Sequence, residues 1–269
     1  MTSKLVQAAE EGDIITVMRM VEKGATIRIR NDALHQASHY GHLEIVKYLI
    51  DNGADIHAGY NYSLRIASGN GHIEVVKFLV EKGADIHADD NEALHWASSH
   101  GHLEIVKYLI CQGANIHTKD EYALCRASQN GHIEVVKFLV ENGADIHVDD
   151  DNAFRLATDN GHLEIVKFLV KEGANVHADD DDALYKTSYK GHLEIIKFLV
   201  ENGVDIHTNN DCAIRWASRY GHLEVVKFLI ENGTDIIHAN YDEALRLASE
   251  EGHIEVIKFL IENRANISI

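Results

Sequence analysis

The chain has 269 residues, of which 45% are hydrophobic, and it carries a formal net charge of −18 with no proline. That charge argues against a nucleic-acid partner, because binding to phosphates needs a basic face that releases counterions. No apolar run approaches the roughly 18 residues of a membrane helix, and residues 1–5 lack a signal-peptide core. We therefore expect a soluble, cytoplasmic protein without membrane association.

A Gly-His unit returns along the chain at a fixed interval of 30 residues. Its glycines are Gly41, Gly71, Gly101, Gly131, Gly161, Gly191 and Gly221, so that 71 − 41 = 30, and a further copy begins one residue late at Gly252. A constant period in this range is the signature of a solenoid built from one small structural unit. The sequence therefore predicts a single elongated domain over residues 1–269.

Residues 1–30 are predicted to form a degenerate N-terminal capping unit. Gly12-Asp13 stands where the other units have Gly-His, and an apolar stripe precedes it at Leu5, Val6, Ala8 and Ala9. Charged residues surround the stripe, as expected of a terminal unit whose outer face meets water.

Residues 31–238 contain seven regular units, each predicted to hold two helices. After Gly101, the residues Leu103, Val106, Leu109 and Ile110 fall on one side of a helix. Glycine can adopt a positive φ and end the preceding helix, and pairs such as Asn52-Gly53 mark the next helix end in the same way. Helices of about ten residues are marginal alone in water, so each must pack against its neighbours.

The segment before each Gly-His predicts the first helix of the unit. Ala93 to His100 recurs as Ala123 to Asn130 and as Ala213 to Tyr220, with a small Ala-Ser pair that allows close helix approach. Residues 239–269 form the predicted C-terminal capping unit, which Ile237 precedes as an extra residue and in which Arg264 replaces the usual glycine. Stacked units of this kind bury an apolar stripe that none can bury alone.

The segments Asn-Gly-Ala-Asp-Ile, Ala-Leu-His-x-Ala-Ser and Gly-His-Leu-Glu-Ile-Val-Lys together resemble ankyrin repeats. The resemblance implies an all-α, right-handed solenoid. The family unit has about 33 residues and a Thr-Pro-Leu-His-x-Ala segment, whereas this chain lacks the Thr-Pro and has a shorter connector. We predict shortened connectors with little or no β-structure, and Asp90 or Asn91 as the N-cap that replaces threonine. The 30-residue, proline-free unit is also similar to ankyrin-repeat proteins of giant DNA viruses of amoebae.

The resemblance implies a non-enzymatic scaffold that binds a partner protein through its concave face and loop tips. The residues just before each Gly-His lie on that face and vary between units, either because they select a partner or because exposed positions drift. The predicted partner-binding residues at these positions are Tyr40, Asn70, His100, Asn130, Asn160, Tyr189, Lys190, Arg219 and Tyr220.

A cluster of basic and aromatic residues is also predicted to bind the partner. It adds Tyr185, Lys186 and Arg215 to Tyr189, Lys190, Arg219 and Tyr220. Tyr and Arg are enriched at binding hot spots, so an acidic peptide could dock there. Alternatively, the cations offset the acidic run Asp179 to Asp182. Trp96 and Trp216, which share one register, are interpreted as core residues in preference to a ligand box.

The sequence predicts no catalytic, cofactor or metal site. The histidines form ladders with members one unit apart, and helices packed about 8–10 Å apart cannot bring them to one zinc with bonds of about 2 Å. We predict that they form hydrogen bonds at turns. His35 and His39 have no third ligand, and Cys111, Cys125 and Cys212 are predicted to be free thiols.

The expected function is a scaffold for another protein, a host protein if the viral resemblance holds. The alternative is a structural protein that associates with itself through its acidic edge and basic cluster.

Overall fold

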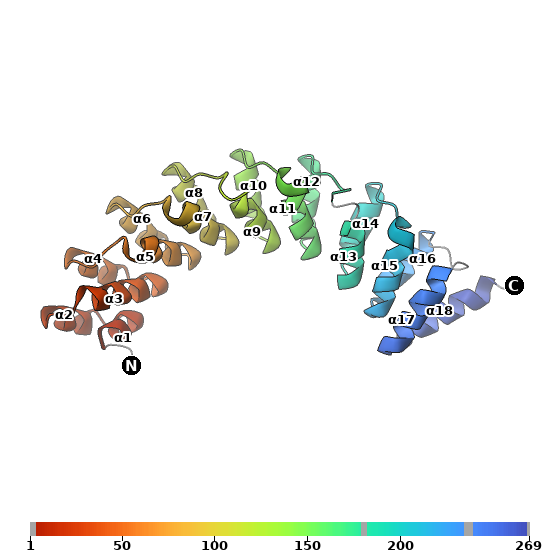
Figure 1. Ribbon diagram of the computed structural model, residues 1–269, viewed down its shortest axis with the longest axis horizontal. Coiled ribbons are helices and arrows are strands. Elements are labelled where there is room, and N and C mark those ends of the chain that lie inside the picture. Colours follow the sequence, from red (N-terminus) through yellow and green to blue (C-terminus); the bar gives the residue numbers. More distant parts are fainter. Residues whose placement is uncertain (1–3, 179–181, 234–238, 268–269) are drawn as a thin grey trace. The chain divides into compact units, whose positions relative to one another are not determined.

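The computed structural model describes residues 4–178, 182–233 and 239–267, and within these ranges it contains eighteen α-helices and no β-strand (Figure 1). The chain is therefore an all-α repeat protein with the short, strand-free connectors that the sequence predicts. The acidic residues Asp179 to Asp181 and the extra residue Ile237 lie outside the described residues.

The helices follow one another in pairs, and each pair is one repeat. In chain order they are α1 (Lys4–Glu11), α2 (Ile14–Glu22), α3 (Ile27–Tyr40), α4 (Leu43–Asp51), α5 (Ala58–Gly69), α6 (Ile73–Glu81), α7 (Ala88–Ser99), α8 (Leu103–Cys111), α9 (Tyr122–Gln129), α10 (Ile133–Glu141), α11 (Val148–Asp159), α12 (Leu163–Lys171), α13 (Asp182–Lys190), α14 (Leu193–Glu201), α15 (Thr208–Arg219), α16 (Leu223–Glu231), α17 (Ala239–Glu251) and α18 (Ile254–Ile267).

The chain divides into two compact units, Met1–Asp145 and Ile146–Ile269, so the single domain over residues 1–269 stays a prediction. In the first unit the odd-numbered helices α1 to α9 pack side by side in one layer, and the even-numbered helices α2 to α10 form a second layer. In the second unit, helices α11 to α17 and α12 to α18 form two layers in the same way. Each repeat thus contributes one helix to each of the two layers of its unit.

The core of each repeat lies between its two helices and the neighbouring repeats. In α7, Leu94 and Ala97 are fully buried, and in α8 so are Val106 and Leu109. Ile105, at 1% exposed, belongs to this core, whereas the sequence favoured Leu103, which is only half-buried. The stripe therefore follows positions i, i+1 and i+4 of the second helix. In the first repeat Leu5, Val6, Ala8 and Ala9 are buried as predicted.

Glycine ends the helices as the sequence predicts. Gly53, at φ +82°, follows α4, and its N–H donates to the carbonyl of Ile50 at 3.0 Å while that of Ala54 donates to Leu49 at 2.9 Å. These two bonds form a Schellman motif, which satisfies carbonyls that the helix itself leaves unpaired.

Within the described residues, five repeats contain a left-handed turn at or just before the start of the first helix, which the sequence analysis did not anticipate. Asp89, Asp90 and Asn91 have φ values of 54°, 58° and 63°. The same three-residue turn recurs at Gly59–Asn61, Lys119–Glu121, Asp149–Asp151 and Asn209–Asp211. Glycine, Asn and Asp tolerate this region better than other residues do, which accounts for their abundance in the connectors.

The side chain that ends this turn bonds to the next repeat. Oδ1 of the buried Asn91 accepts a hydrogen bond from the backbone N–H of Asn115 at 2.9 Å and lies 3.1 Å from Nδ1 of His87. Asp90 is exposed, with its carboxylate 3.9 Å from Nζ of Lys119. The prediction that Asp90 or Asn91 caps its own helix is therefore wrong, because the left-handed turn directs Asn91 to the neighbouring repeat.

The same link recurs where other residues take the place of Asn91. Asn31, Asn61 and Asp151 accept from the backbone N–H of Asp55, Asp85 and Asn175 at 2.8, 3.0 and 2.9 Å. Asp151 is only 4% exposed, so the acidic connectors do not present all of their carboxylates to solvent.

The histidine of each Gly-His also bonds across repeats. In the first unit, Nε2 of His42, His72, His102 and His132 lies 3.0, 2.8, 2.9 and 3.0 Å from the carbonyl oxygens of Glu10, His39, Gly69 and Ser99. In the second unit, His192, His222 and His253 bond in the same way to Asp159, Tyr189 and Arg219. Because a carbonyl only accepts, Nε2 carries the hydrogen. These are the turn hydrogen bonds predicted for this series.

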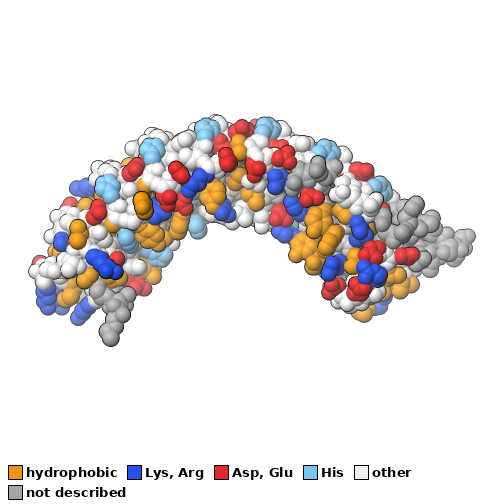
Figure 2. Space-filling view, viewed as in Figure 1, with side chains coloured by type: hydrophobic (Ala, Val, Ile, Leu, Met, Phe, Trp, Pro, Cys, Tyr) orange, Lys and Arg blue, Asp and Glu red, His pale blue; other side chains and the backbone are white. Residues whose placement is uncertain are grey.

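Histidines of the Asp-Ile-His series stay within their own connector. Nδ1 of His147 and His207 lies 2.8 and 2.7 Å from the carboxylates of Asp151 and Asp211. Figure 2 shows histidine side chains recurring at intervals along one edge of the first unit.

Within the described ranges, no helix has both the length and the apolar character needed to cross a membrane.

Candidate partner-binding face

One face of each first helix is left uncovered by the core. In α7 this face contains Glu92, Trp96, Ser99 and His100, which are spaced i, i+4, i+7 and i+8 and therefore align on a helix. Leu94 and its neighbours on the opposite face are buried. We call the uncovered side the first-helix face.

The predicted partner-binding residues all lie on or beside this face. Tyr40, Tyr189 and Tyr220 expose 45%, 37% and 41% of their surface. Asn70, His100, Asn130, Asn160 and Lys190 are also exposed, whereas Tyr185, Lys186, Arg215 and Arg219 are half-buried. Tyr40, Asn70, His100 and Asn130 belong to the first unit and the others to the second. Their exposure meets the first requirement of a binding role, which itself stays a prediction.

The asparagines among these residues also stabilise the scaffold. Nδ2 of Asn70 donates to the carbonyl of Ile66 at 2.7 Å, and Nδ2 of Asn160 donates to that of Leu156 at 2.8 Å. Nδ2 of Asn130 donates to the carbonyl of Ser99 in the preceding repeat, also at 2.8 Å. These amides therefore satisfy carbonyls at helix ends, and less of their hydrogen-bonding capacity is left for a partner.

In the second unit, aromatic side chains of α13 and α15 form one cluster. The ring of Tyr189 lies 4.4 Å from that of Tyr220, edge to face, and Trp216 lies 5.4 Å from Tyr185 and 5.9 Å from Tyr220. Figure 2 shows hydrophobic side chains gathered over these helices. Trp216 is half-buried and lies on the first-helix face, so its interpretation as a core residue is wrong.

Three of the cations around this aromatic cluster face carboxylates of the chain itself, and the fourth, Arg215, bonds to a backbone carbonyl. Lys190 pairs with Asp159 at 3.0 Å and Arg219 pairs with Glu251 at 3.4 Å. Nζ of Lys186 lies 3.9 Å from Asp182, the member of the acidic run that the structure describes. Nη2 of Arg215 donates to the carbonyl of Asn209 at 3.1 Å. Of these cations, only Lys186 faces a described member of the acidic run Asp179 to Asp182, so the interpretation that the cations offset this run stays a prediction.

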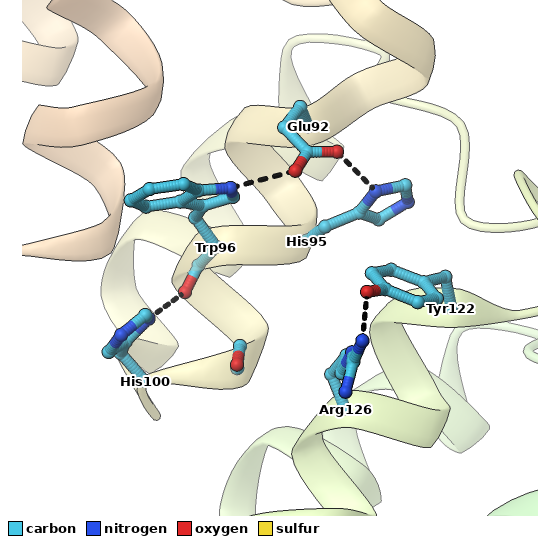
Figure 3. Close-up of a pocket in the computed structure, with 7 residues that line it drawn as sticks. Glu92, His95, Trp96, His100, Tyr122 and Arg126 are labelled. Atoms are coloured by element: carbon cyan, nitrogen blue, oxygen red, sulfur yellow. Dashed lines mark hydrogen bonds and ion pairs between the residues drawn. The ribbon is translucent and has the colours of Figure 1, made fainter.

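In the first unit, a cavity of roughly 310 Å³ lies between α7 and α9. Figure 3 shows its walls, which are Glu92, His95, Trp96, Ser99, His100, Tyr122 and Arg126. Five of these residues come from α7 and its C-cap, four of them on the first-helix face and His95 beneath it, and two come from α9. The cavity is therefore part of the same face that carries the predicted residue His100.

Glu92 holds two walls of the cavity in place. Its Oε1 accepts from Nε1 of Trp96 at 2.8 Å, and its Oε2 lies 3.4 Å from Nδ1 of His95 (Figure 3). The same Oε2 lies 3.5 Å from Nζ of Lys119. Burial acts to raise the pKa of Glu92, but the hydrogen bonds from Trp96 and His95 and the charge of Lys119 outweigh it and lower the pKa. The carboxyl group is therefore ionised at neutral pH.

His95 is almost fully buried beneath this network. Burial lowers its pKa, although the hydrogen bond with Glu92 opposes that shift. Nε2 of His95 lies 2.9 Å from Oγ1 of Thr118, and its ring lies 5.0 Å from that of Tyr122 in an edge-to-face contact. His95 is thus a neutral, fixed side chain that joins α7 to the next repeat.

The opposite wall of the cavity is formed by Tyr122 and Arg126. The guanidinium of Arg126 lies over the Tyr122 ring, with Cζ 4.5 Å from the centroid, and Nη2 donates to the phenol oxygen. Its Nη1 donates to Oε1 of Gln129 at 2.7 Å. Both partners are neutral, and within the described residues Arg126 forms no ion pair, so its positive charge faces the cavity uncompensated.

The sequence analysis named His100 but missed Glu92, His95, Tyr122 and Arg126. The sequence signal that could have identified some of these residues is the variation between units at two further positions of the first helix. Where α7 has Glu92 and Trp96, α9 has Tyr122 and Arg126, each exactly one period later. Trp96 itself is half-buried on this face, so its interpretation as a core residue is also wrong.

Among the described residues, no group of three or more His, Cys, Asp or Glu side chains is placed to hold a metal ion. Cys111, Cys125 and Cys212 form no disulfide bond and remain thiols, as predicted.

Comparison with known proteins identifies the repeat. A family model described as ankyrin repeats in three copies matches residues 58–120, 94–180, 154–240 and 184–269, and a second, ankyrin repeats in many copies, matches residues 5–50 and 34–80. Ankyrin repeat domain-containing protein 49 of Bos taurus is 41% identical over 59 residues, and the Homo sapiens protein of that name is 42% identical over 59. Each match covers 20% of this chain and only 25% of the relative. Because the family models together cover residues 5–269, the chain belongs to the ankyrin-repeat family.

Proposed function

We propose that this protein is a non-enzymatic scaffold that binds another protein through the first-helix face and the connector tips. Ankyrin repeats generally mediate protein–protein interactions, and ankyrin-repeat proteins are typically non-enzymatic scaffolds. One observation carries the proposal for this chain. The two residues before each Gly-His differ from repeat to repeat and, apart from the buried Gly69, are exposed or half-buried, while the Gly-His and the second helix barely change.

The chemistry of the face supports a protein partner. The rings of Tyr189, Trp216 and Tyr220 lie within 4.4 to 6.2 Å of one another, so they offer a large contact area at a small cost in side-chain entropy. The net charge of −18 disfavours nucleic acid. On its resemblance to the repeats of giant amoebal viruses, we further propose that the protein acts in the host cytoplasm on a host protein.

A paired pull-down tests this proposal. The tagged full chain, the variant Tyr189→Ala/Tyr220→Ala and the control Lys197→Ala/Lys227→Ala are each incubated with amoebal lysate. The control lysines lie on the second helices α14 and α16, where each pairs with a nearby Glu. We expect proteins retained by the wild type and by the control to be lost from the tyrosine variant. Equal retention by all three chains would contradict binding through this face.

Light scattering across salt concentrations tests the alternative of self-association. A scaffold for a foreign partner is expected to be a monomer at low and high salt. Oligomers that dissociate as salt rises would instead favour a structural protein held together by charge.

A further inference from the structure

The charge on Arg126 is the least compensated feature of the cavity between α7 and α9. Within the described residues, its two hydrogen bonds go to the Tyr122 phenol and the Gln129 amide, both neutral. Within the described residues of the first unit, no carboxylate forms an ion pair with Arg126. Arg65 in α5, by contrast, pairs with Asp89 at 2.7 Å. A guanidinium has five N–H donors, so three of those on Arg126 are still available to a ligand.

Glu92 lines the same cavity but does not neutralise Arg126. Both of its oxygens are engaged, one by Trp96 and the other by His95 and Lys119. Figure 3 shows its carboxylate directed toward Trp96 and His95, on the other side of the cavity from Arg126. The negative charge of Glu92 is therefore balanced by its own partners on the α7 side, and the wall formed by α9 keeps the positive charge of Arg126.

The remaining wall is aromatic and depends on a glycine in the preceding repeat. A Cβ atom at Gly69 would lie 2.6 Å from Cε3 of Trp96, so only glycine leaves room for the indole against α5. The equivalent tryptophan in the second unit, Trp216, packs against the rings of Tyr185 and Tyr189 instead. With Trp96 held against α5 and by Glu92, the space between α7 and α9 stays open.

We infer that this cavity receives an acidic side chain of the partner together with an adjacent apolar residue. The carboxylate bonds to Arg126, and the apolar residue packs on Trp96 and Tyr122. This inference rests on the proposed scaffold function. It specifies Asp or Glu within a segment and not a chain terminus, because terminal carboxylates are typically captured by backbone N–H groups, and this cavity offers side-chain donors. The net charge of −18 disfavours a partner segment with many acids.

Both walls are held before a ligand arrives, which favours binding. Tyr122 and Gln129 fix the guanidinium, and Glu92 fixes the indole. Side chains that are already ordered lose little entropy when a partner docks. Trp, Tyr and Arg are also the residues that most often dominate binding energy at interfaces.

Blocked tripeptides provide the probe, and intrinsic fluorescence provides the readout. The full chain with Trp216→Phe retains Trp96 as its single tryptophan. It is titrated with acetyl-Phe-Glu-Phe-amide, with the Gln and Lys analogues, and with acetyl-Phe-Gln-Phe carrying a free terminal carboxylate. We expect the Glu peptide to bind about tenfold more tightly than the Gln peptide, as suits a charge-assisted hydrogen bond.

Two variants test whether the preference for the Glu peptide over the Gln peptide arises in this cavity. Arg126→Gln is expected to abolish the preference for Glu, and the control Arg65→Gln is expected to keep it. Circular dichroism verifies that each variant is folded. Equal binding of the Glu and Gln peptides, a preference retained by Arg126→Gln, tighter binding of the free carboxylate, or no binding of any peptide would each overturn the inference. If the pull-down still succeeds in that case, the scaffold function survives and only the identity of the ligand is wrong.

Discussion

The imidazole of His102 lies directly against the α-carbon of Gly71, the glycine of the preceding repeat. A Cβ atom at Gly71 would come within 2.7 Å of Cε1 and 2.9 Å of Nδ1 of this ring. Glycine is therefore required at this position for two reasons, its positive φ of 82° and the space that the ring occupies.

Comparison of the variants Gly71→Ala and Gly83→Ala separates the cost of the positive φ from the cost of the clash with the ring. Gly83 also has a positive φ, 96°, but an added Cβ would meet nothing within 4 Å. We expect Gly83→Ala to lower the free energy of unfolding by about 1 kcal/mol, the cost of a left-handed residue. Gly71→Ala is expected to cost roughly 1–2 kcal/mol more, because His102 must also shift from the Gly69 carbonyl. Urea unfolding measures both, and equal losses would contradict the role of the ring.

The stability of the protein is expected to fall as the pH drops from 7.5 to 5.5. Burial lowers the pKa of His95, as it does for His35, His102 and His192. Below the unfolded pKa of about 6.5, the unfolded chain takes up protons that the native state does not, so the free energy of unfolding decreases.

The variant His95→Gln isolates one of these groups. His95 faces Glu92, Thr118 and Tyr122, with Lys119 and Asp90 nearby. Glutamine does not titrate, so the difference in stability between wild type and variant is expected to narrow as the pH falls. Thermal unfolding followed at 222 nm checks this, and a difference independent of pH would show that His95 is not the titrating group.

Replacement of Tyr60 by glycine is expected to stabilise the protein. Tyr60 has a φ of 57° in the left-handed turn within the first residues of α5, and 78% of its surface is exposed. Left-handed backbone costs a bulky residue about 1–2 kcal/mol, which exceeds the extra unfolded-state entropy of glycine. We expect a gain of about 0.5–1 kcal/mol for Tyr60→Gly and a smaller one for Asp90→Gly, since Asp tolerates this region better. A lower urea midpoint for Tyr60→Gly would contradict this account of the turn.

The three cysteines are expected to differ in reactivity. Cys111 is exposed, whereas Cys125 and Cys212 are buried, and burial raises the pKa of the Cys212 thiol. Because the thiolate is the reactive form, one thiol of the native protein should react promptly with a thiol reagent at pH 8, and the other two only after unfolding. Mass spectrometry of the labelled peptides assigns the sites, and prompt labelling of Cys212 would contradict its burial.

The helix pairs and their ends could be predicted from the sequence, because a strict repeat period places equivalent residues at the same position of every repeat. Gly41 and Gly53 both have the positive φ that their positions predict. The left-handed turns were not foreseen. Asn and Asp usually visit this region as single residues, so the run Asp89 to Asn91 gave no reason to expect three in succession.

The cavity was missed because it depends on contacts between repeats. Trp96 meets Gly69, 27 residues earlier, and forms one cavity with Arg126, a full period later. Within a single repeat, Trp96 resembles an ordinary apolar residue of an amphipathic helix. Alignment of successive first helices pairs Trp96 with Ile66 and Arg126, and only the structure shows that its indole packs on Gly69.

The bonds from the Gly-His imidazoles reach main-chain oxygen atoms, which every amino acid possesses. His102 bonds to Gly69 and His222 bonds to Tyr189 at 2.9 and 2.8 Å, although the residues that supply the oxygen share no side-chain chemistry. His253 makes the same bond to Arg219 across 34 residues where His222 spans 33. Selection can therefore change outward side chains without breaking these histidine bonds, and duplication or loss of a whole 30-residue block leaves the remaining bonds of this kind chemically the same.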